Sequence, residues 1–152
     1  TDVTQAKTDI FTLDCNGRVM RFPFLKYLLV IVDTHRAEVL ESAELYRLAK
    51  TVIVIDHHRK NVDFINNSIV FQHDPSASSA GEMVSELLQY MPVKPVITDC
   101  EANALLAGIM LDTKNFIIRA GVRTFEAAAY LKDKGADTVN AKKLFANSKM
   151  IE

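Results

Sequence analysis

The feature that most constrains the fold is a pair of apolar strands, each of which ends at an acidic residue. Residues 27–32 are apolar without interruption and lead to Asp33, and residues 51–55 form a second strand that leads to Asp56. Between them, residues 37–50 carry apolar side chains at roughly helical spacing. Because strands that are apolar on both faces are typical of parallel sheets covered by helices, this pattern predicts a βαβ unit.

The rest of the chain continues the alternation of strands and helices. Two capping boxes, Ser79–Glu82 and Thr98–Glu101, each predict the start of a helix, and the second helix is apolar nearly all round and ends at Asp112. Four further elements are predicted: strands over 68–72 and 116–118, and helices over 125–134 and 137–147. The predicted fold class is therefore α/β, with a mostly parallel sheet flanked by helices.

The first 24 residues differ from this pattern. Residues 9–15 and 18–22 alternate polar and apolar side chains around Asn16-Gly17, and Pro23 follows. Such a pair of segments around Asn-Gly predicts a β-hairpin with a two-residue turn. We therefore divide the chain into an N-terminal hairpin over 1–24, of unknown origin, and a domain over 25–152.

Composition narrows the function classes. The chain has 152 residues, 49% of them hydrophobic, which suits one globular domain. Eighteen basic against nineteen acidic residues argue against a long nucleic acid as partner. Its two cysteines form no C-x-x-C pair, and the sequence has neither a signal peptide nor an apolar run of the roughly 18 residues that a membrane span needs. We expect a cytoplasmic domain.

Acidic residues and histidines gather where a site is expected. Asp33 and the triplet Asp56-His57-His58 follow two neighbouring strands, and ligands of open α/β sheets bind beyond the carboxyl ends of strands. A third acid, Asp112, ends the buried helix, where the helix dipole disfavours an anion unless a charged partner is near. Carboxylates and imidazoles together suit a divalent ion of intermediate hardness such as Mn²⁺. Asp33 alone also suits a turn, and His35 a hydrogen-bonded or surface histidine.

Asp56-His57-His58 resembles the signature of the DHH phosphoesterase superfamily. Asp33 lies 24 residues before His57, as the aspartate of the second motif does, and Asp112 resembles the fourth motif. Several segments together resemble the GdpP/YybT-type cyclic-di-AMP phosphodiesterases of Gram-positive bacteria: 32–36, 54–59, 74–82, 105–116, 123–131 and 135–137.

The resemblance implies a hydrolase that opens cyclic di-AMP to linear 5′-pApA with two Mn²⁺ ions. Asp33 would bridge the ions, and His57 and Asp112 would hold the second one. His58 would face the scissile phosphate, and Asp56 would orient an imidazole.

Four further residues are tentative contacts to substrate or phosphate. Ser78 and Ser79 lie at a helix N-terminus, which favours anions, although Ser79 is equally well interpreted as an N-cap. Arg59 would pair with phosphate or remain a solvated charge, and His35 is the fourth.

The resemblance also has gaps. Residues 1–32 contain no His-x-x-x-Asp-x-Asp first motif, and the partner domain with a Gly-rich stretch that the resemblance implies is not among the 152 residues. We therefore expect a piece of a larger, membrane-anchored and homodimeric enzyme that binds metal weakly and turns over little by itself. Two alternatives stay open: hydrolysis of short linear dinucleotides or pyrophosphate, and a non-catalytic nucleotide-binding module that has lost the first motif.

Overall fold

The computed structural model describes residues 9–13, 19–23 and 28–148. The two N-terminal strands, β1 (Asp9–Leu13) and β2 (Val19–Pro23), pair antiparallel, as the hairpin prediction requires. Leu13 lies opposite Val19, whereas a two-residue turn at Asn16-Gly17 would place Leu13 opposite Met20, so the predicted register is wrong by one residue. Asn16 and Gly17 themselves lie outside the described residues.

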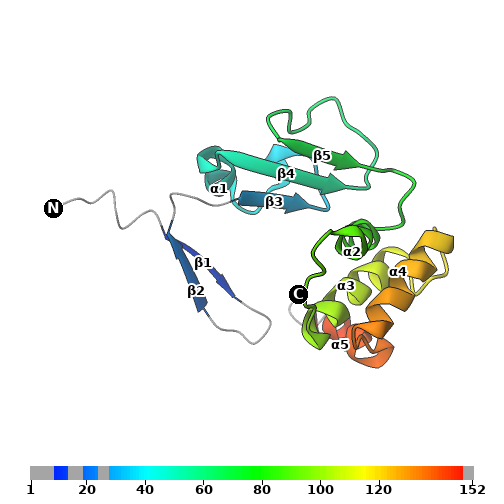
Figure 1. Cartoon of the computed structure of the whole chain (residues 1–152). Coiled ribbons are helices and arrows are strands. Elements are labelled where there is room, and N and C mark those ends of the chain that lie inside the picture. The colour runs from blue at the N-terminus through cyan, green and yellow to red at the C-terminus, as the bar shows by residue number, and fades with distance from the viewer. Residues whose placement is uncertain (1–8, 14–18, 24–27, 149–152) are drawn as a thin grey trace.

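Three parallel strands form the sheet in the order β3-β4-β5 (Figure 1). They are β3 (Leu28–Val32), β4 (Thr51–Asp56) and β5 (Val70–His73). Val52 and Val54 of β4 are fully buried, as expected for the central strand. Because all three strands run in one direction, the residues that follow them meet at one edge, where Ile55 pairs with Val32 and with Gln72. The parallel βαβ arrangement predicted from the sequence is confirmed.

The connection between β3 and β4 is not the single helix predicted over 37–50. A 3₁₀ turn, η3 (Ala37–Val39), is followed by a short helix, α1 (Ala43–Leu48). The Ser42 hydroxyl accepts a hydrogen bond from the Leu45 amide at 3.2 Å. Serine therefore acts as an N-cap inside the expected helix, and a new helix starts there instead of continuing an earlier one.

Four helices pack together below the sheet in the view of Figure 1: α2 (Ala80–Tyr90), α3 (Asp99–Asp112), α4 (Val122–Asp133) and α5 (Thr138–Ser148). Thr98 and Glu101 form the predicted capping box of α3, and the Asp137 carboxylate accepts from the Asn140 amide at 3.1 Å as the N-cap of α5. The helix α3 contacts the other three, which explains its apolar surface. Among the described residues, no helix is long and apolar enough to cross a membrane.

The helices α2 and α3 approach very closely at Gly81. A Cβ atom at this position would lie 3.0 Å from the Leu105 carbonyl oxygen and 3.2 Å from the Ile109 side chain. Only glycine fits here without a shift of the neighbouring helix. The end of α3 is thus held at a defined distance from α2, which itself contacts β4.

The strand predicted over 116–118 is wrong, because these residues form a tight turn after α3. The amide of Phe116 donates to the Thr113 hydroxyl, and the amides of Ile117 and Ile118 both donate to the Thr113 carbonyl, each at 2.9 Å. All three residues from 114 to 116 have a positive φ, between 49° and 65°. With its amides used inside the turn, the segment has none left for a neighbouring strand.

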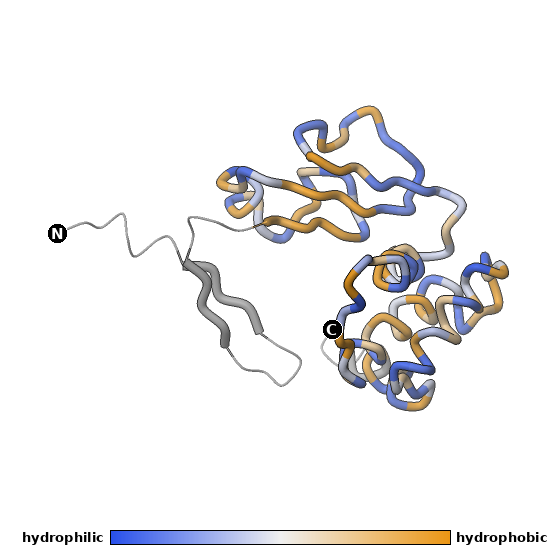
Figure 2. Tube along the Cα trace, viewed as in Figure 1, coloured by the Kyte–Doolittle hydropathy of each residue, from blue (hydrophilic) through white to orange (hydrophobic). Residues whose placement is uncertain are grey.

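The buried apolar residues of the described chain form separate clusters. One lies among the helices and centres on Leu106, Ile109 and Leu131, and another lies in the sheet around Val52 and Val54. A third, with Ile55, Ala77 and Met83, joins β4 to α2. Figure 2 shows hydrophobic stretches along the strands, whereas hydrophobic and hydrophilic residues alternate along the helices.

Candidate metal centre

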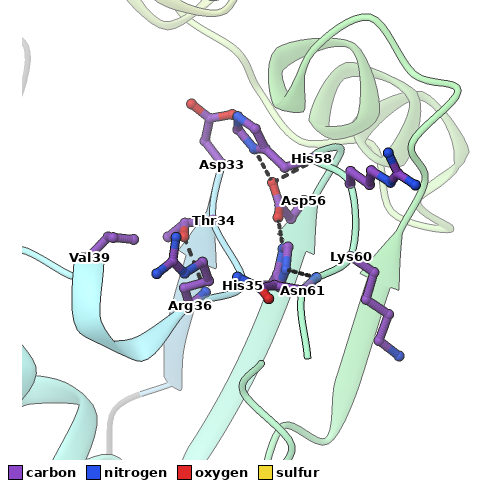
Figure 3. Close-up of a pocket in the computed structure, with 10 residues that line it drawn as sticks. Asp33, Thr34, His35, Arg36, Val39, Asp56, His58, Lys60 and Asn61 are labelled. Atoms are coloured by element: carbon purple, nitrogen blue, oxygen red, sulfur yellow. Dashed lines mark hydrogen bonds and ion pairs between the residues drawn. The ribbon is translucent and has the colours of Figure 1, made fainter. Parts of the chain in front are cut away.

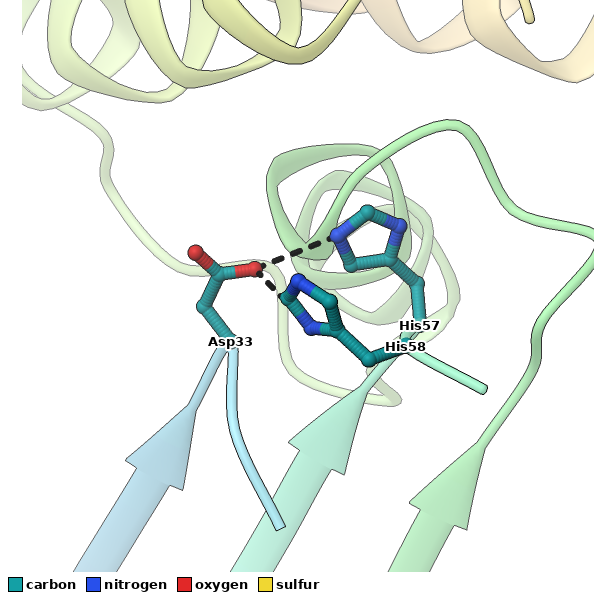
Figure 4. Close-up of side chains that lie close together, drawn as sticks. All are labelled: Asp33, His57 and His58. Atoms are coloured by element: carbon teal, nitrogen blue, oxygen red, sulfur yellow. Dashed lines mark ion pairs between the residues drawn. The ribbon is translucent and has the colours of Figure 1, made fainter. Parts of the chain in front are cut away.

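Asp33 follows β3 directly and turns away from the strand. Its φ of 65° lies in the left-handed region, which short polar residues tolerate better than most others. The Asp33 amide still donates to the Ile55 carbonyl at 3.0 Å, so the backbone remains fixed to β4. The side chain is 55% exposed and is directed toward the residues that follow β4 (Figure 4).

Asp33, His57 and Asp112 come together although they belong to three different parts of the chain. The Nε2 atom of His57 lies 3.2 Å from Oδ1 of Asp33 and 3.5 Å from Oδ2 of Asp112. His57 follows β4, and Asp112 is the last residue of α3. The three residues predicted as metal ligands are therefore neighbours at the carboxyl edge of the sheet.

The His57 ring is buried and has no hydrogen-bond partner among the described residues. Its side chain is only 4% exposed, and neither Nδ1 nor Nε2 forms a hydrogen bond. The 3.2 Å contact with Asp33 is close enough for an ion pair, but its angles are not those of a hydrogen bond. Because a buried polar atom without a partner is costly, the ring suits a bound cation between Nε2 and the two carboxylates. The donor set of one imidazole and two carboxylates fits a divalent metal.

Electrostatics at Asp112 favour the same interpretation. Burial raises the pKa of the Asp112 carboxyl, and the negative charge of Asp33 raises it further. Two carboxylates that face each other without a cation repel, and a divalent ion between them removes this repulsion.

Asp56 is completely buried and binds two histidines. The Nδ1 atoms of His35 and His58 contact its Oδ2 and Oδ1 atoms respectively, the His58 contact at 2.7 Å (Figure 3). Burial alone would raise the pKa of Asp56, but the hydrogen bonds from His35 and His58 outweigh it and leave the pKa below its ordinary value. The hydrogen bond to Asp56 in turn raises the pKa of His58.

His58 lies beside the ligand atoms but is already engaged. Asp33, His57 and His58 offer ligand atoms within 4.8 Å of one another. The Nδ1 atom of His58, however, is 3.9 Å from Asp33 and only 2.7 Å from Asp56. Nδ1 is thus used by Asp56, and Nε2 is the nitrogen left for another partner.

A cavity of about 600 Å³ opens beside this cluster. Asp33 and His58 lie at one end, and three cationic side chains, Arg36, Arg59 and Lys60, contribute to the rest of its wall (Figure 3). Arg36 is paired with Glu38, and the Lys60 ammonium lies over the Phe64 ring. Arg59 is exposed and forms no ion pair within the described part of the chain, so its charge is available to a ligand.

The structure places the two predicted serines away from this cavity's wall. The Ser78 hydroxyl donates to the buried Glu82 carboxylate at 2.6 Å, and the Ser79 hydroxyl accepts from the Glu82 amide at 3.0 Å. Ser79 is therefore the N-cap of α2. In a capping box the Glu82 carboxylate would accept from the Ser79 backbone amide, but here it accepts from Ser78 instead. Both hydroxyls are buried.

Two groups that hold the site are not among the predicted site residues. His73 donates from Nε2 to the His58 carbonyl at 2.6 Å, and the Asn61 amide donates to Nε2 of His35 at 3.0 Å. Asp56 and His73 are neighbours in the β4–β5 register. A signal for His73 was available, since a histidine at the end of a third parallel strand is expected at the same edge. The Asn61 amide has no such signal, because every residue except proline carries one.

Comparisons with known proteins agree with this architecture. The model of the DHH family, N-terminal domain, matches residues 3–109, a range that includes both strands of the hairpin. The cyclic-di-AMP phosphodiesterase GdpP of Geobacillus thermodenitrificans is 51% identical over 122 residues, which cover 80% of this chain and 18% of the relative. GdpP of Bacillus subtilis is 49% identical over 116 residues, and PdeA of Listeria monocytogenes is 46% identical over 114. The chain spans less than a fifth of the length of these relatives.

Two solved structures share the fold. An exopolyphosphatase-related protein from Bacteroides fragilis has a TM-score of 0.65 at 20% identity, over 75% of this chain and 34% of the other. A protein described as a putative family II inorganic pyrophosphatase from Methanococcus jannaschii has a TM-score of 0.58 at 20% identity, over 77% of this chain and 40% of the other. On the match of its sequence to the family model, the chain belongs to the DHH family.

Proposed function

We propose that the chain is a metal-dependent phosphodiesterase domain that hydrolyses cyclic di-AMP to linear 5′-pApA. One observation carries the proposal: the buried Nε2 atom of His57 has no hydrogen-bond partner and faces the carboxylates of Asp33 and Asp112. The cyclic-dinucleotide substrate is supported by the relatives, which are named cyclic-di-AMP phosphodiesterases.

Asp33, His57 and Asp112 are the proposed metal ligands, and Mn²⁺ is the proposed ion. Asp33 is the most exposed of the three, and the bridging role that the family resemblance implies for it stays a prediction. A bound divalent ion would lower the pKa of a water molecule and neutralise charge on the phosphate. All three side chains must be unprotonated to bind it, so affinity should fall as the pH is lowered.

His58 is the proposed proton donor. In the hydrolysis, the oxygen of water forms a bond to phosphorus, the bond between phosphorus and the 3′ oxygen breaks, and the 3′ oxygen takes up a proton. With Nδ1 held by Asp56, Nε2 is the nitrogen of His58 that is left for a ligand. His58 lines the cavity, and its side chain is 56% exposed. The raised pKa of His58 favours the protonated ring that could supply this proton.

The tentative residues take different parts in this proposal. Arg59 is the proposed phosphate contact, because its unpaired guanidinium lines the cavity beside His58. Ser78 and Ser79 hold Glu82 and the start of α2, since their hydroxyls are buried and bonded there. His35 has both ring nitrogens occupied and is buried, so it has no atom left for a substrate. The membrane anchor and homodimer implied by the resemblance stay predictions, and the relatives' greater length supports a larger enzyme.

The test is Mn²⁺-dependent cleavage of cyclic di-AMP, with linear 5′-pApA and pyrophosphate assayed as alternative substrates. The parent chain is compared with His57→Ala and Asp112→Asn, and Asp133→Asn is the matched control because Asp133 is an exposed aspartate outside the site. We expect slow product formation, consistent with the low turnover predicted for a piece of the enzyme, from the parent and from Asp133→Asn only. If the parent binds Mn²⁺ in a His57-dependent way but cleaves none of the substrates, the chain is a binding module and the proposed activity is wrong.

A further inference from the structure

His35 is a buried histidine whose hydrogen bonds determine which of its nitrogens carries the proton. The Asn61 backbone amide lies 3.0 Å from Nε2 of His35, and a backbone N–H can only donate. Nε2 therefore accepts, and the proton of the neutral ring must be on Nδ1. From there it is donated to Oδ2 of Asp56. The His35 ring is almost fully buried, so solvent does not compete for these contacts.

The hydrogen bond from His35 restricts the orientation of the Asp56 carboxylate, and Asp56 in turn determines which nitrogen of His58 is protonated. With Oδ2 bound to His35, the buried carboxylate cannot rotate freely, and Oδ1 is left to accept from both Nδ1 and the backbone amide of His58, at 2.7 and 3.3 Å. A carboxylate can only accept while it is ionised, so Nδ1 of His58 carries a proton. Nε2 is then the nitrogen left for a substrate: it carries a lone pair in the neutral ring and, in the charged ring, the proton that His58 is proposed to donate. His58 lines the cavity.

We propose that His35 is a positioning residue that acts through Asp56 to fix which nitrogen of His58 is presented to a substrate. The inference rests on the role proposed above for His58. The chain of contacts runs from the Asn61 amide through His35 and Asp56 to His58, and every link is a directed hydrogen bond (Figure 3). Groups of this kind, one step removed from the reacting atoms, hold histidines in one tautomer in many enzymes.

A simple packing role is the competing explanation. The His35 ring also contacts the rings of Phe71 and His73, with centroids 6.4 and 5.6 Å apart. If only this packing mattered, a phenylalanine would replace His35 without consequence for His58. The two explanations therefore differ in what they predict for the proton on His58.

The test measures the His58 tautomer by ¹⁵N–¹H correlation NMR of the metal-free chain at a pH above the pKa of His58, where the ring is neutral and only one nitrogen carries a proton. The signals are assigned by His58→Gln. His35→Asn places an amide donor near the position of Nδ1, whereas His35→Gln places it near that of Nε2, so these two variants are chemically matched. We expect His58 to keep its proton on Nδ1 in the parent and in His35→Asn. In His35→Gln and His35→Phe, we expect a mixture with the Nε2-protonated form.

A packing control and a stability check complete the design. Phe71→Leu changes the packing against His35 without touching Asp56, and we expect it to leave the His58 tautomer unchanged. Thermal unfolding establishes which variants are folded, and the Asn and Gln pair decides the question if the Phe variant does not fold. The inference is overturned if folded His35→Gln leaves His58 protonated on Nδ1 only, as in His35→Asn.

Cleavage of cyclic di-AMP by the same preparations separates this inference from the proposed function. If the parent cleaves, we expect kcat of His35→Gln to fall about 10- to 100-fold while KM changes little. If the parent does not cleave but the tautomer follows the variants as expected, the positioning role holds and the proposed activity is wrong. If the parent cleaves and the His58 tautomer does not change in the variants, the proposed activity holds and the positioning role of His35 is wrong.

Discussion

Replacing His57 with leucine should stabilise the metal-free protein. Both ring nitrogens of His57 are buried without a hydrogen-bond partner, and the unpaired N–H donor of the ring alone costs about 1–3 kcal/mol. Leucine removes this cost but also loses the attraction of the ring to Asp33 and Asp112. This attraction is small, because Asp33 is half exposed and exposed ion pairs contribute about 0–1 kcal/mol. The net expected gain in the free energy of unfolding is about 1–2 kcal/mol.

Urea unfolding in the presence of EDTA tests this expectation. With a denaturant slope of about 1–3 kcal/mol per molar urea, the midpoint should rise by roughly 0.5–1 M. Mn²⁺ at a hundredfold excess over its Kd should then stabilise the parent by about 2.7 kcal/mol and reverse the order of the two proteins. His73→Leu is the matched control, because His73 has a partner in the His58 carbonyl and its loss should destabilise the protein. The reasoning is refuted if His57→Leu is less stable than the parent in EDTA.

Three further predictions concern the acids around the site. Asp112→Asn should lower Mn²⁺ affinity by about 10-fold or more in calorimetry, because Asp112 is a proposed ligand. It should cause no loss of stability in EDTA, because burial has raised the pKa of the Asp112 carboxyl. The Ser76 and Arg123 hydrogen bonds lower the pKa of Asp74 to about 2. The ionised Asp74 carboxylate therefore stabilises the fold by about 1 kcal/mol after allowance for solvent screening. This contribution is present above pH 4 and is lost as the pH falls toward 2. Urea unfolding should therefore distinguish Asp74→Asn from the parent at pH 7 but not at pH 2. Thr124→Val should cost about 2 kcal/mol in urea unfolding, since the Thr124 hydroxyl donates to buried Glu82 at 2.6 Å; a loss under 0.5 kcal/mol would contradict this.

Local patterns were sufficient to predict most elements and to bring the three candidate metal ligands together. Strands of β-branched residues, the Thr98 capping box and the Asp137 N-cap are short-range signals, and each matches what the structure contains. Asp33, His57 and Asp112 could be brought together from the sequence because strand ends share one edge and α3 ends at an acid.

The errors arose where a tertiary or local contact outweighed propensity. Phe116, Ile117 and Ile118 favour a strand by composition, but their amides bond to Thr113. Ser42 divides a stretch whose apolar spacing looks helical throughout. The role of His35 could not be predicted, because it depends on a backbone amide 26 residues away that leaves no mark in the sequence.

The close approach of α2 and α3 at Gly81 limits how far Asp112, a proposed metal ligand, can move. Asp112 lies three residues beyond Ile109, whose side chain would be 3.2 Å from a Cβ atom at position 81. A single methyl group there would push α3 by a few tenths of an ångström, and a helix transmits such a shift along its axis as a nearly rigid rod. Ligand distances in metal sites hold to about ±0.2 Å. The absence of a side chain at Gly81, which lies outside the site, therefore keeps the Asp112 carboxylate close to His57.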